Sequence, residues 1–203
     1  MQSPAPRHLA RLREFVGATT RLVDRAAGEA VVLEEGCRLM RALIAEDDWL
    51  PTTFAQPHPL RYQQHLLYGD PLERFSVVSF VWGPGQHTPI HDHTVWGVIG
   101  VLRGAECAQR YRVSEHGVAP EGAEQRLDRG DVEVVSPTVG DVHRVRNAFA
   151  DRTSVSIHLY GGNIGRIARH VFATDSPGAK HFVSGYSNQM APNLWWADED
   201  RSR

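Results

Sequence analysis

The sequence has little of what marks a membrane, secreted or nucleic-acid-binding protein. Its 203 residues include only two cysteines, too few for a disulfide framework. No apolar run approaches the roughly 18 residues of a membrane span, and the first residues lack the apolar core of a signal peptide. The formal net charge is −2 with both signs spread along the chain, so there is no basic stretch for nucleic acid. We therefore expect a cytoplasmic protein with no nucleic-acid or membrane partner.

The cysteines also lack the spacing of a metal site. Cys37 and Cys107 stand far apart in the chain, and we interpret both as buried structural thiols. Histidine, in contrast, is abundant, with 11 residues. Whether this number matters depends on where the histidines stand.

The chain changes character near residue 60. Residues 6–47 carry apolar side chains at helical spacing, which predicts two helices, and Pro51 suits the end of the second. Later runs rich in Val, Ile and aromatic residues, such as "RFSVVSFVWG" and "TSVSIHLYGG", are separated by Gly, Pro, Asn or Asp. This pattern is typical of antiparallel barrels and sandwiches, and the lack of strand–helix alternation argues against a parallel sheet. We expect one mainly β domain over residues 1–203, with a helical part at 1–60, a β-barrel at 61–175 and an irregular tail at 176–203.

The stretch "HTPIHDHTVWG" suggests a metal site. Side chains alternate along a strand, so His91 and His93 point to the same side and can bind one ion. Such a pair alone can equally be a surface accident or a hydrogen-bonded pair. About fifty residues later, "SPTVGDVHRVRN" again places a histidine, His143, after a turn signal. Two β-segments of this kind resemble the two-part pattern of the cupin barrels, a jelly-roll architecture, over about residues 74–160.

This pattern lacks a carboxylate ligand. The usual first cupin motif carries a glutamate soon after its histidine pair, but here "TVWGVIG" follows, and the next Asp or Glu after the pair is Glu106. The predicted ligands are therefore His91, His93 and His143, with the rest of the coordination sphere open, unlike a closed structural zinc site. His87 has the same strand parity and is the rival ligand, although the family pattern uses only the later pair and the distant histidine.

The stretch "SVSIHLYGGNIG" makes the resemblance more specific. Ser156, His158 and Tyr160 alternate and share one face of a strand, where they could form a hydrogen-bonded relay or simply the polar face of an amphipathic strand. Together with "HDHT" and "GDVH", they resemble the thiol dioxygenases, a cupin family that includes cysteine dioxygenase and 3-mercaptopropionate dioxygenase. The resemblance covers most of the chain, from the helices through "RYQQHLLYGD" to "SGYSN".

The resemblance implies a chemistry and a cofactor. It implies that the three histidines bind non-haem Fe(II) and that Ser156, His158 and Tyr160 form a relay beside it. O₂ would be the co-substrate, and both of its atoms would be added to the sulfur of a small thiol carboxylic acid to give a sulfinic acid. Three neutral imidazoles leave the full charge on the metal, which favours binding of an anionic thiolate.

Two departures bear on the substrate. Mammalian-type cysteine dioxygenases carry a cysteine, cross-linked to the active-site tyrosine, where this chain has Gly97, so we expect no cross-link. They also carry an arginine in the segment that reads "RYQQH" here, where Gln64 matches. This resembles the Gln-type bacterial enzymes, in which an arginine beyond the relay tyrosine binds the carboxylate. Arg169 matches that arginine better than Arg166, and a guanidinium suits a carboxylate because it donates two parallel hydrogen bonds.

The resemblance therefore favours 3-mercaptopropionate, with L-cysteine as the alternative substrate. A non-catalytic metal-binding cupin is a second alternative. A third is an isomerase or another dioxygenase using Zn, Ni or Mn, although such cupins usually carry the missing glutamate. The sequence leaves open whether the protein is a monomer or a small homo-oligomer, and whether Trp96 packs in the core or lines the pocket.

Overall fold

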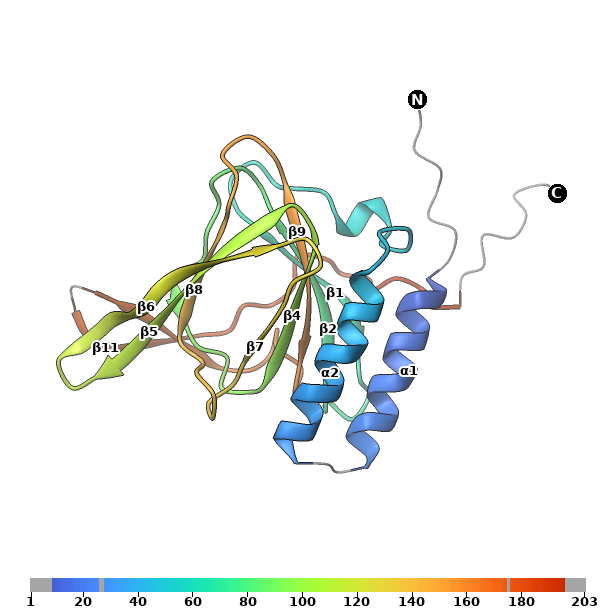
Figure 1. Cartoon of the computed structure of the whole chain (residues 1–203), viewed down its shortest axis with the longest axis horizontal. Coiled ribbons are helices and arrows are strands. Elements are labelled where there is room, and N and C mark those ends of the chain that lie inside the picture. Colours follow the sequence, from blue (N-terminus) through green and yellow to red (C-terminus); the bar gives the residue numbers. More distant parts are fainter. Residues whose placement is uncertain (1–8, 26–27, 175, 196–203) are drawn as a thin grey trace.

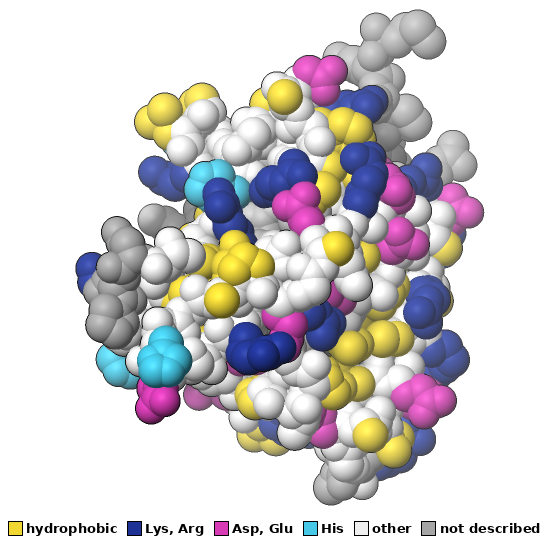
Figure 2. Space-filling model, turned by 60° about the vertical axis from the view of Figure 1, so that its left-hand side comes forward, with side chains coloured by type: hydrophobic (Ala, Val, Ile, Leu, Met, Phe, Trp, Pro, Cys, Tyr) yellow, Lys and Arg dark blue, Asp and Glu magenta, His cyan; other side chains and the backbone are white. Residues whose placement is uncertain are grey.

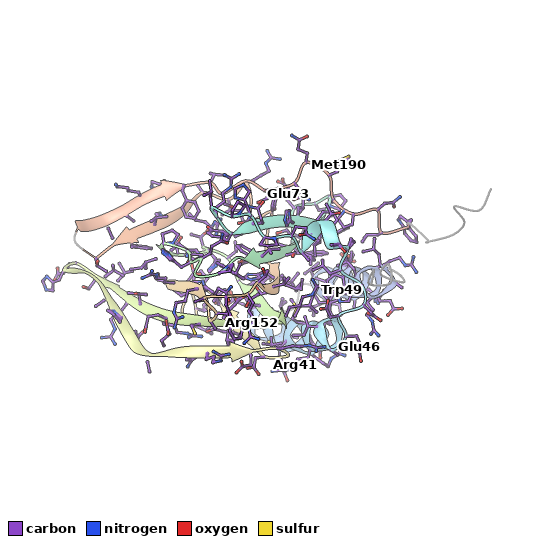
Figure 3. The ribbon with its side chains drawn as sticks, turned by 90° about the horizontal axis from the view of Figure 1, so that it is seen from above. Arg41, Glu46, Trp49, Glu73, Arg152 and Met190 are labelled. Atoms are coloured by element: carbon purple, nitrogen blue, oxygen red, sulfur yellow. The ribbon has the colours of Figure 1, made fainter. Side chains whose placement is uncertain are left out.

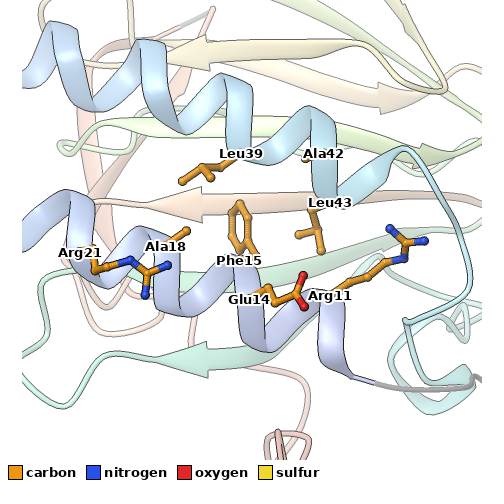
Figure 4. Close-up of a pocket in the computed structure, with 8 residues that line it drawn as sticks. All are labelled: Arg11, Glu14, Phe15, Ala18, Arg21, Leu39, Ala42 and Leu43. Atoms are coloured by element: carbon orange, nitrogen blue, oxygen red, sulfur yellow. The ribbon is translucent and has the colours of Figure 1, made fainter.

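The chain begins with a helical hairpin. In this computed structural model, which describes residues 9–25, 28–174 and 176–195, helices α1 (Ala10–Asp24) and α2 (Glu29–Ile44) lie side by side against one face of the β-structure (Figure 1). The prediction of two helices is confirmed. Their apolar faces are buried, because neither helix would be stable without a surface to cover. On the outer side of the hairpin, a cavity of about 330 Å³ lies between the helices, with Phe15 and Leu43 among its walls (Figure 4).

The described strands form two antiparallel sheets. The first has the order β1 (Gln63–Gly69), β2 (Ser76–Trp82), β9 (Ser154–Tyr160), β4 (Gly97–Arg103) and β7 (Val132–Val135). The second has the order β11 (Ser176–Phe182), β10 (Arg169–Ala173), β3 (Ile90–His91), β8 (His143–Asn147), β5 (Ala105–Ser114) and β6 (Gly117–Asp128). A short 3-10 helix, η1 (Thr52–Phe54), precedes β1.

The two sheets close into a jelly-roll barrel with the helices on the first sheet (Figure 1). The predicted fold class, a mainly β cupin barrel with N-terminal helices, is confirmed. No described helix is long and apolar enough to cross a membrane. On the face shown in Figure 2, positively and negatively charged side chains are intermixed. The division of the chain into one domain with three parts stays a prediction.

One segment differs from the expectation. Residues 176–182 were predicted to be irregular because the sequence there contains Pro177 and Gly178, but they form β11, which pairs with β10. β11 ends its sheet, and an edge strand tolerates proline because one side of its backbone needs no partner strand. Residues 183–195 contain no helix or strand, as the prediction for the tail implied.

Strand β9 separates two packed regions. Every residue of β9 is buried, because one of its faces meets the helices and the other faces the barrel interior. Val155, Ile157 and Leu159 belong to the core between sheet and helices, together with Trp49, which lies at the junction of helices and strands (Figure 3). The alternate residues, Ser156, His158 and Tyr160, therefore face the barrel interior.

The helices approach the sheet closely at a glycine. A Cβ atom at Gly100 of β4 would lie 2.6 Å from Cγ of Met40 on α2. Only a residue without a side chain permits this distance. This close contact between α2 and β4 holds the first sheet against the helices, and it therefore helps to position the neighbouring strand β9.

Candidate functional site

The three predicted ligand histidines come together inside the barrel. His91 on β3 lies opposite His143 on β8, and His93 follows two residues after His91. One ring nitrogen from each lies within 4.8 Å of the others, and all three side chains are buried. No carboxylate belongs to this cluster within the described residues. His87 is exposed and lies outside the cluster, with its Nδ1 3.0 Å from the carbonyl oxygen of Thr88.

Hydrogen bonds orient two of these imidazoles. Nδ1 of His93 lies 2.9 Å from Oδ1 of Asp141, and Nδ1 of His91 lies 3.1 Å from the carbonyl oxygen of Pro89. With Nδ1 of each ring donating to an oxygen, Nε2 keeps the lone pair that a metal ion needs. Burial and the neighbouring His93 lower the pKa of His91 to about 3, and burial lowers the pKa of His143 well below its ordinary value. Both rings are thus neutral near neutral pH, as ligands must be.

Asp141 is a functional candidate that sequence reasoning missed. Besides the ring of His93, its carboxylate accepts the backbone N–H groups of His93 at 3.0 Å and Thr94 at 2.8 Å. Thr94 has a left-handed φ of 60°, which is unusual for a threonine and which these bonds hold in place. Burial alone would raise the pKa of Asp141, but its hydrogen bonds with His93 and Thr94 hold this pKa below the ordinary value. The sequence signal was the aspartate two residues before His143, in "GDVH".

The three relay candidates form a continuous hydrogen-bonded chain. Oγ of Ser156 lies 2.8 Å from Nε2 of His158, and Nδ1 of His158 lies 2.8 Å from the hydroxyl oxygen of Tyr160. The alternative of an exposed polar strand face is wrong, because no residue of β9 is exposed. The ring of Tyr160 stacks on that of His93, with centroids 5.3 Å apart, so the chain ends beside the histidine cluster. Burial lowers the pKa of His158 and raises that of Tyr160, which keeps both neutral.

Gly97 lies directly against the relay tyrosine. It pairs with Tyr160 across β4 and β9, and a Cβ atom there would lie 2.9 Å from Cδ1 of the tyrosine ring. The place next to Tyr160 thus offers no thiol for a cross-link. Trp96, the preceding residue, packs against the core under the helices, which favours a packing role.

Arg169 and Gln64 meet at one serine. The guanidinium of Arg169 donates to Oγ of Ser184 at 2.7 Å, and Nε2 of Gln64 donates to the same oxygen at 3.2 Å. The cavity beside them, about 450 Å³, is lined by Arg61, Tyr62, Gln64, Pro89, Val171, Phe182, Ser184, Gly185, Tyr186 and Ser187. Sequence reasoning missed Ser184, because it lies in the segment that was predicted to be irregular.

The two arginine candidates differ sharply in environment. Arg169 is only 3% exposed, its Nε has no partner, and it makes no ion pair with a described residue. Burial lowers its pKa. Arg166, in contrast, has a side chain that is 76% exposed and pairs with Glu73. A buried guanidinium without a carboxylate partner is costly unless an anion binds there, which favours Arg169 as the anion-binding residue.

A jelly-roll barrel with a buried three-histidine cluster defines this protein as a cupin with a candidate metal centre. The family "Cysteine dioxygenase type I" matches residues 4–171, and the chain belongs to this family. A relative, cysteine dioxygenase type 1 of Danio rerio, is 27% identical over 138 residues, which is 65% of this chain and 66% of that protein. The chain thus spans slightly less than two thirds of this relative.

Solved structures with similar chains include two bacterial proteins. One is an uncharacterized conserved protein with a double-stranded β-helix domain from Klebsiella pneumoniae, at a TM-score of 0.46 and 18% identity over 60% of this chain and 93% of that one. The other is a cupin superfamily protein from Desulfitobacterium hafniense, at a TM-score of 0.44 and 11% identity over 58% of this chain and 94% of that one.

Proposed function

We propose that this protein is a non-haem iron thiol dioxygenase that converts a small thiol carboxylate to its sulfinate. Membership of the cysteine dioxygenase type I family supports this proposal. The observation that carries it is the combination, in one barrel, of a carboxylate-free histidine cluster and the tyrosine relay beside it. The balanced reaction is R–SH + O₂ → R–SO₂⁻ + H⁺, so each turnover releases one proton.

The histidine cluster fits an iron(II) ion. His91, His93 and His143 each offer one ring nitrogen, and the three side chains are buried and close enough to share one ion. We propose that these three side chains hold the ion. When bound, iron(II) would supply the charge that ionises the thiol and the redox chemistry that O₂ requires.

The remaining residues bind and orient the substrate. We propose that Arg169 binds the carboxylate, because it is a buried cation without an anionic partner. Ser184 holds Arg169 and Gln64 together at the cavity wall. Tyr160 holds a proton on its hydroxyl oxygen, and its hydrogen bond to His158 aims that group toward the histidine cluster. These residues position the thiol and its proton.

We favour 3-mercaptopropionate as substrate, with L-cysteine as the alternative. The neutral amide of Gln64 stands where the mammalian-type enzymes have an arginine, which leaves Arg169 to bind the carboxylate, and 3-mercaptopropionate requires no contact for an amino group. A pocket that merely lacks an amine contact discriminates weakly between the two, whereas one that leaves a polar group unpaired discriminates strongly.

The test is oxygen uptake by the iron-loaded protein with each thiol acid in parallel, with the sulfinate quantified. We expect coupled uptake with both acids and a higher kcat/KM for 3-mercaptopropionate. A higher kcat/KM for L-cysteine would contradict the substrate preference and retain the chemistry. Tight metal binding without uptake would instead favour a non-catalytic metal-binding cupin or an isomerase, and uptake only with nickel or manganese would favour another dioxygenase.

A further inference from the structure

A buried carboxyl group lies behind the relay. Glu106 on β5 is 1% exposed, and its carboxyl faces the hydroxyl of Ser156 from β9 and the indole N–H of Trp82 from β2. Trp82 also donates to Oγ of Ser156 at 3.2 Å, which ties these three side chains together. Ser156 is four residues from Tyr160, so the Cα atoms of these two relay residues lie roughly 13 Å apart along β9, and Glu106 lies at the end of the relay away from the tyrosine.

Glu106 has no cation to balance it. Its Oε1 has no hydrogen-bond partner, and no arginine or lysine among the described residues pairs with it. The charged group that acts on Glu106 is another acid, Glu133 of β7, which accepts a hydrogen bond from Arg110 at 3.1 Å. From β8, the amide of Asn147 donates to backbone carbonyls instead. A buried, unpaired carboxyl is costly for the fold, and such groups concentrate at functional sites.

We propose that Glu106 is the inner end of the relay and that it accepts, through the three relay residues, the proton that the thiol loses on binding. This inference rests on the proposed function, which requires one proton to leave the thiol in each turnover. A proton-accepting role would explain why a carboxyl group lies at this buried position, where an apolar side chain would be less costly for the fold.

The transfer balances without any change in heavy-atom bonds. The thiol proton passes to the oxygen of Tyr160, whose own hydroxyl proton passes to Nδ1 of His158. The Nε2 proton of His158 then passes to Ser156, and the hydroxyl proton of Ser156 passes to the Glu106 carboxylate. The sulfur becomes a thiolate, Glu106 becomes neutral and His158 changes tautomer, with no electron transferred. When the product leaves, the proton returns along the same residues to the pocket and is released there, which restores the starting tautomer of His158.

The environment of Glu106 suits this role. Burial raises its pKa to about 7, the charge of Glu133 acts in the same direction, and hydrogen bonds from Ser156 and Trp82 oppose the shift. A carboxyl group with this pKa can take up and release a proton near neutral pH. An ordinary exposed glutamate would stay ionised there and would not store a proton.

The decisive experiment is the pH profile of kcat, measured as oxygen uptake by the iron-loaded protein with saturating 3-mercaptopropionate. Glu106 accepts the proton only when it is ionised, so for the wild type we expect kcat to rise as the pH passes about 7. For Glu106→Gln we expect kcat to be lower by about 100-fold above pH 7, with no rise near that pH, because the amide does not titrate.

The matched control is Glu133→Gln, the other buried barrel glutamate. It keeps Glu106 but removes a like charge, so the pH at which kcat rises should move downward and the rise should not vanish. An infrared titration of the iron-loaded protein gives a second readout, because the band of a protonated carboxyl near neutral pH should be lost only in Glu106→Gln. A rise of kcat near pH 7 that is equal in the wild type and in Glu106→Gln would overturn the inference. Absence of oxygen uptake with both thiol acids would instead overturn the proposed function, and this inference with it.

Discussion

At the scale of single residues, burial distinguishes Arg169, the proposed carboxylate-binding arginine, from the exposed Arg166. We expect Arg169→Ala to raise KM by roughly 30- to 150-fold, about 2–3 kcal/mol for hydrogen bonds to a charged group, with iron content unchanged. The matched control is Arg166→Ala, because that side chain is exposed and pairs only with Glu73. Steady-state oxygen uptake gives both constants, and equal KM values for the two variants would rule out Arg169 as the carboxylate-binding residue.

The hydroxyl of Tyr160 is expected to matter for rate and not for iron binding. Tyr160→Phe removes one oxygen atom from a ring that stacks on His93, so the histidine cluster should keep its geometry. We expect a loss in kcat of about 10- to 100-fold, the range typical for groups that support a metal site. Tyr68→Phe, on the helix side of β1, is the control. If the two variants turn over equally fast, the relay has no role in the reaction.

Asp141 is expected to control iron affinity through the orientation of His93. In Asp141→Ala the imidazole loses its 2.9 Å partner and the left-handed backbone of Thr94 loses its acceptor. We expect iron affinity to fall by about 10- to 100-fold. Competition with a chelator measures this, with exposed Asp151 replaced by alanine as the control. An unchanged affinity would show that backbone packing alone holds His93.

At the scale of elements, the close packing of strand β9 against β4 requires a residue without a side chain at Gly97. In Gly97→Ala the new methyl group would lie 2.9 Å from the ring of Tyr160 and 3.0 Å from Val135. We expect a loss of about 1–3 kcal/mol in the free energy of unfolding, together with a lower turnover rate, because the tyrosine must move.

A matched glycine on helix α1 should respond in the opposite direction. At Gly17 the nearest atom to a new Cβ is 3.6 Å away and belongs to the flexible side chain of Arg21. Gly17→Ala should therefore add up to about 1 kcal/mol of stability through helix propensity. Urea unfolding of both variants tests the pair, and a destabilisation at Gly17 equal to that at Gly97 would contradict the packing argument.

At the scale of the whole molecule, the buried carboxyl of Glu106 sets a pH dependence of stability. Its pKa is about 7 in the folded state against an ordinary value of 4.5, so the folded protein keeps a proton that the unfolded chain releases. The free energy of unfolding should therefore fall as the pH rises from about 4.5 to 7, by roughly 2–4 kcal/mol from this one group.

Replacement of this one side chain should remove that dependence. Glu106→Gln cannot titrate, so its stability relative to the wild type should be greater at pH 8 than at pH 5. Urea unfolding at the two pH values measures the difference. If the wild type and the variant change in parallel, Glu106 titrates at its ordinary pKa and cannot store a proton near neutrality.

The sequence alone determined the features that depend on local periodicity. The two-residue repeat of a strand placed Ser156, His158 and Tyr160 on one face, and the same repeat placed His91 beside His93. The helical spacing before residue 47 likewise predicted the two helices. Each of these depends only on neighbours in the chain, so it could be recognised before any fold was known.

The tertiary structure decided what depends on residues distant in the sequence. Asp141 is 48 residues from His93, Gln64 meets Ser184 across 120 residues, and Glu106 faces Ser156 from another sheet. The sequence pattern near Arg166 and Arg169 contains two similar arginines, and burial distinguishes them only once β10 takes its place in the sheet. Such contacts depend on which strands become neighbours, and that is set by the packing of the whole barrel, which no local pattern records.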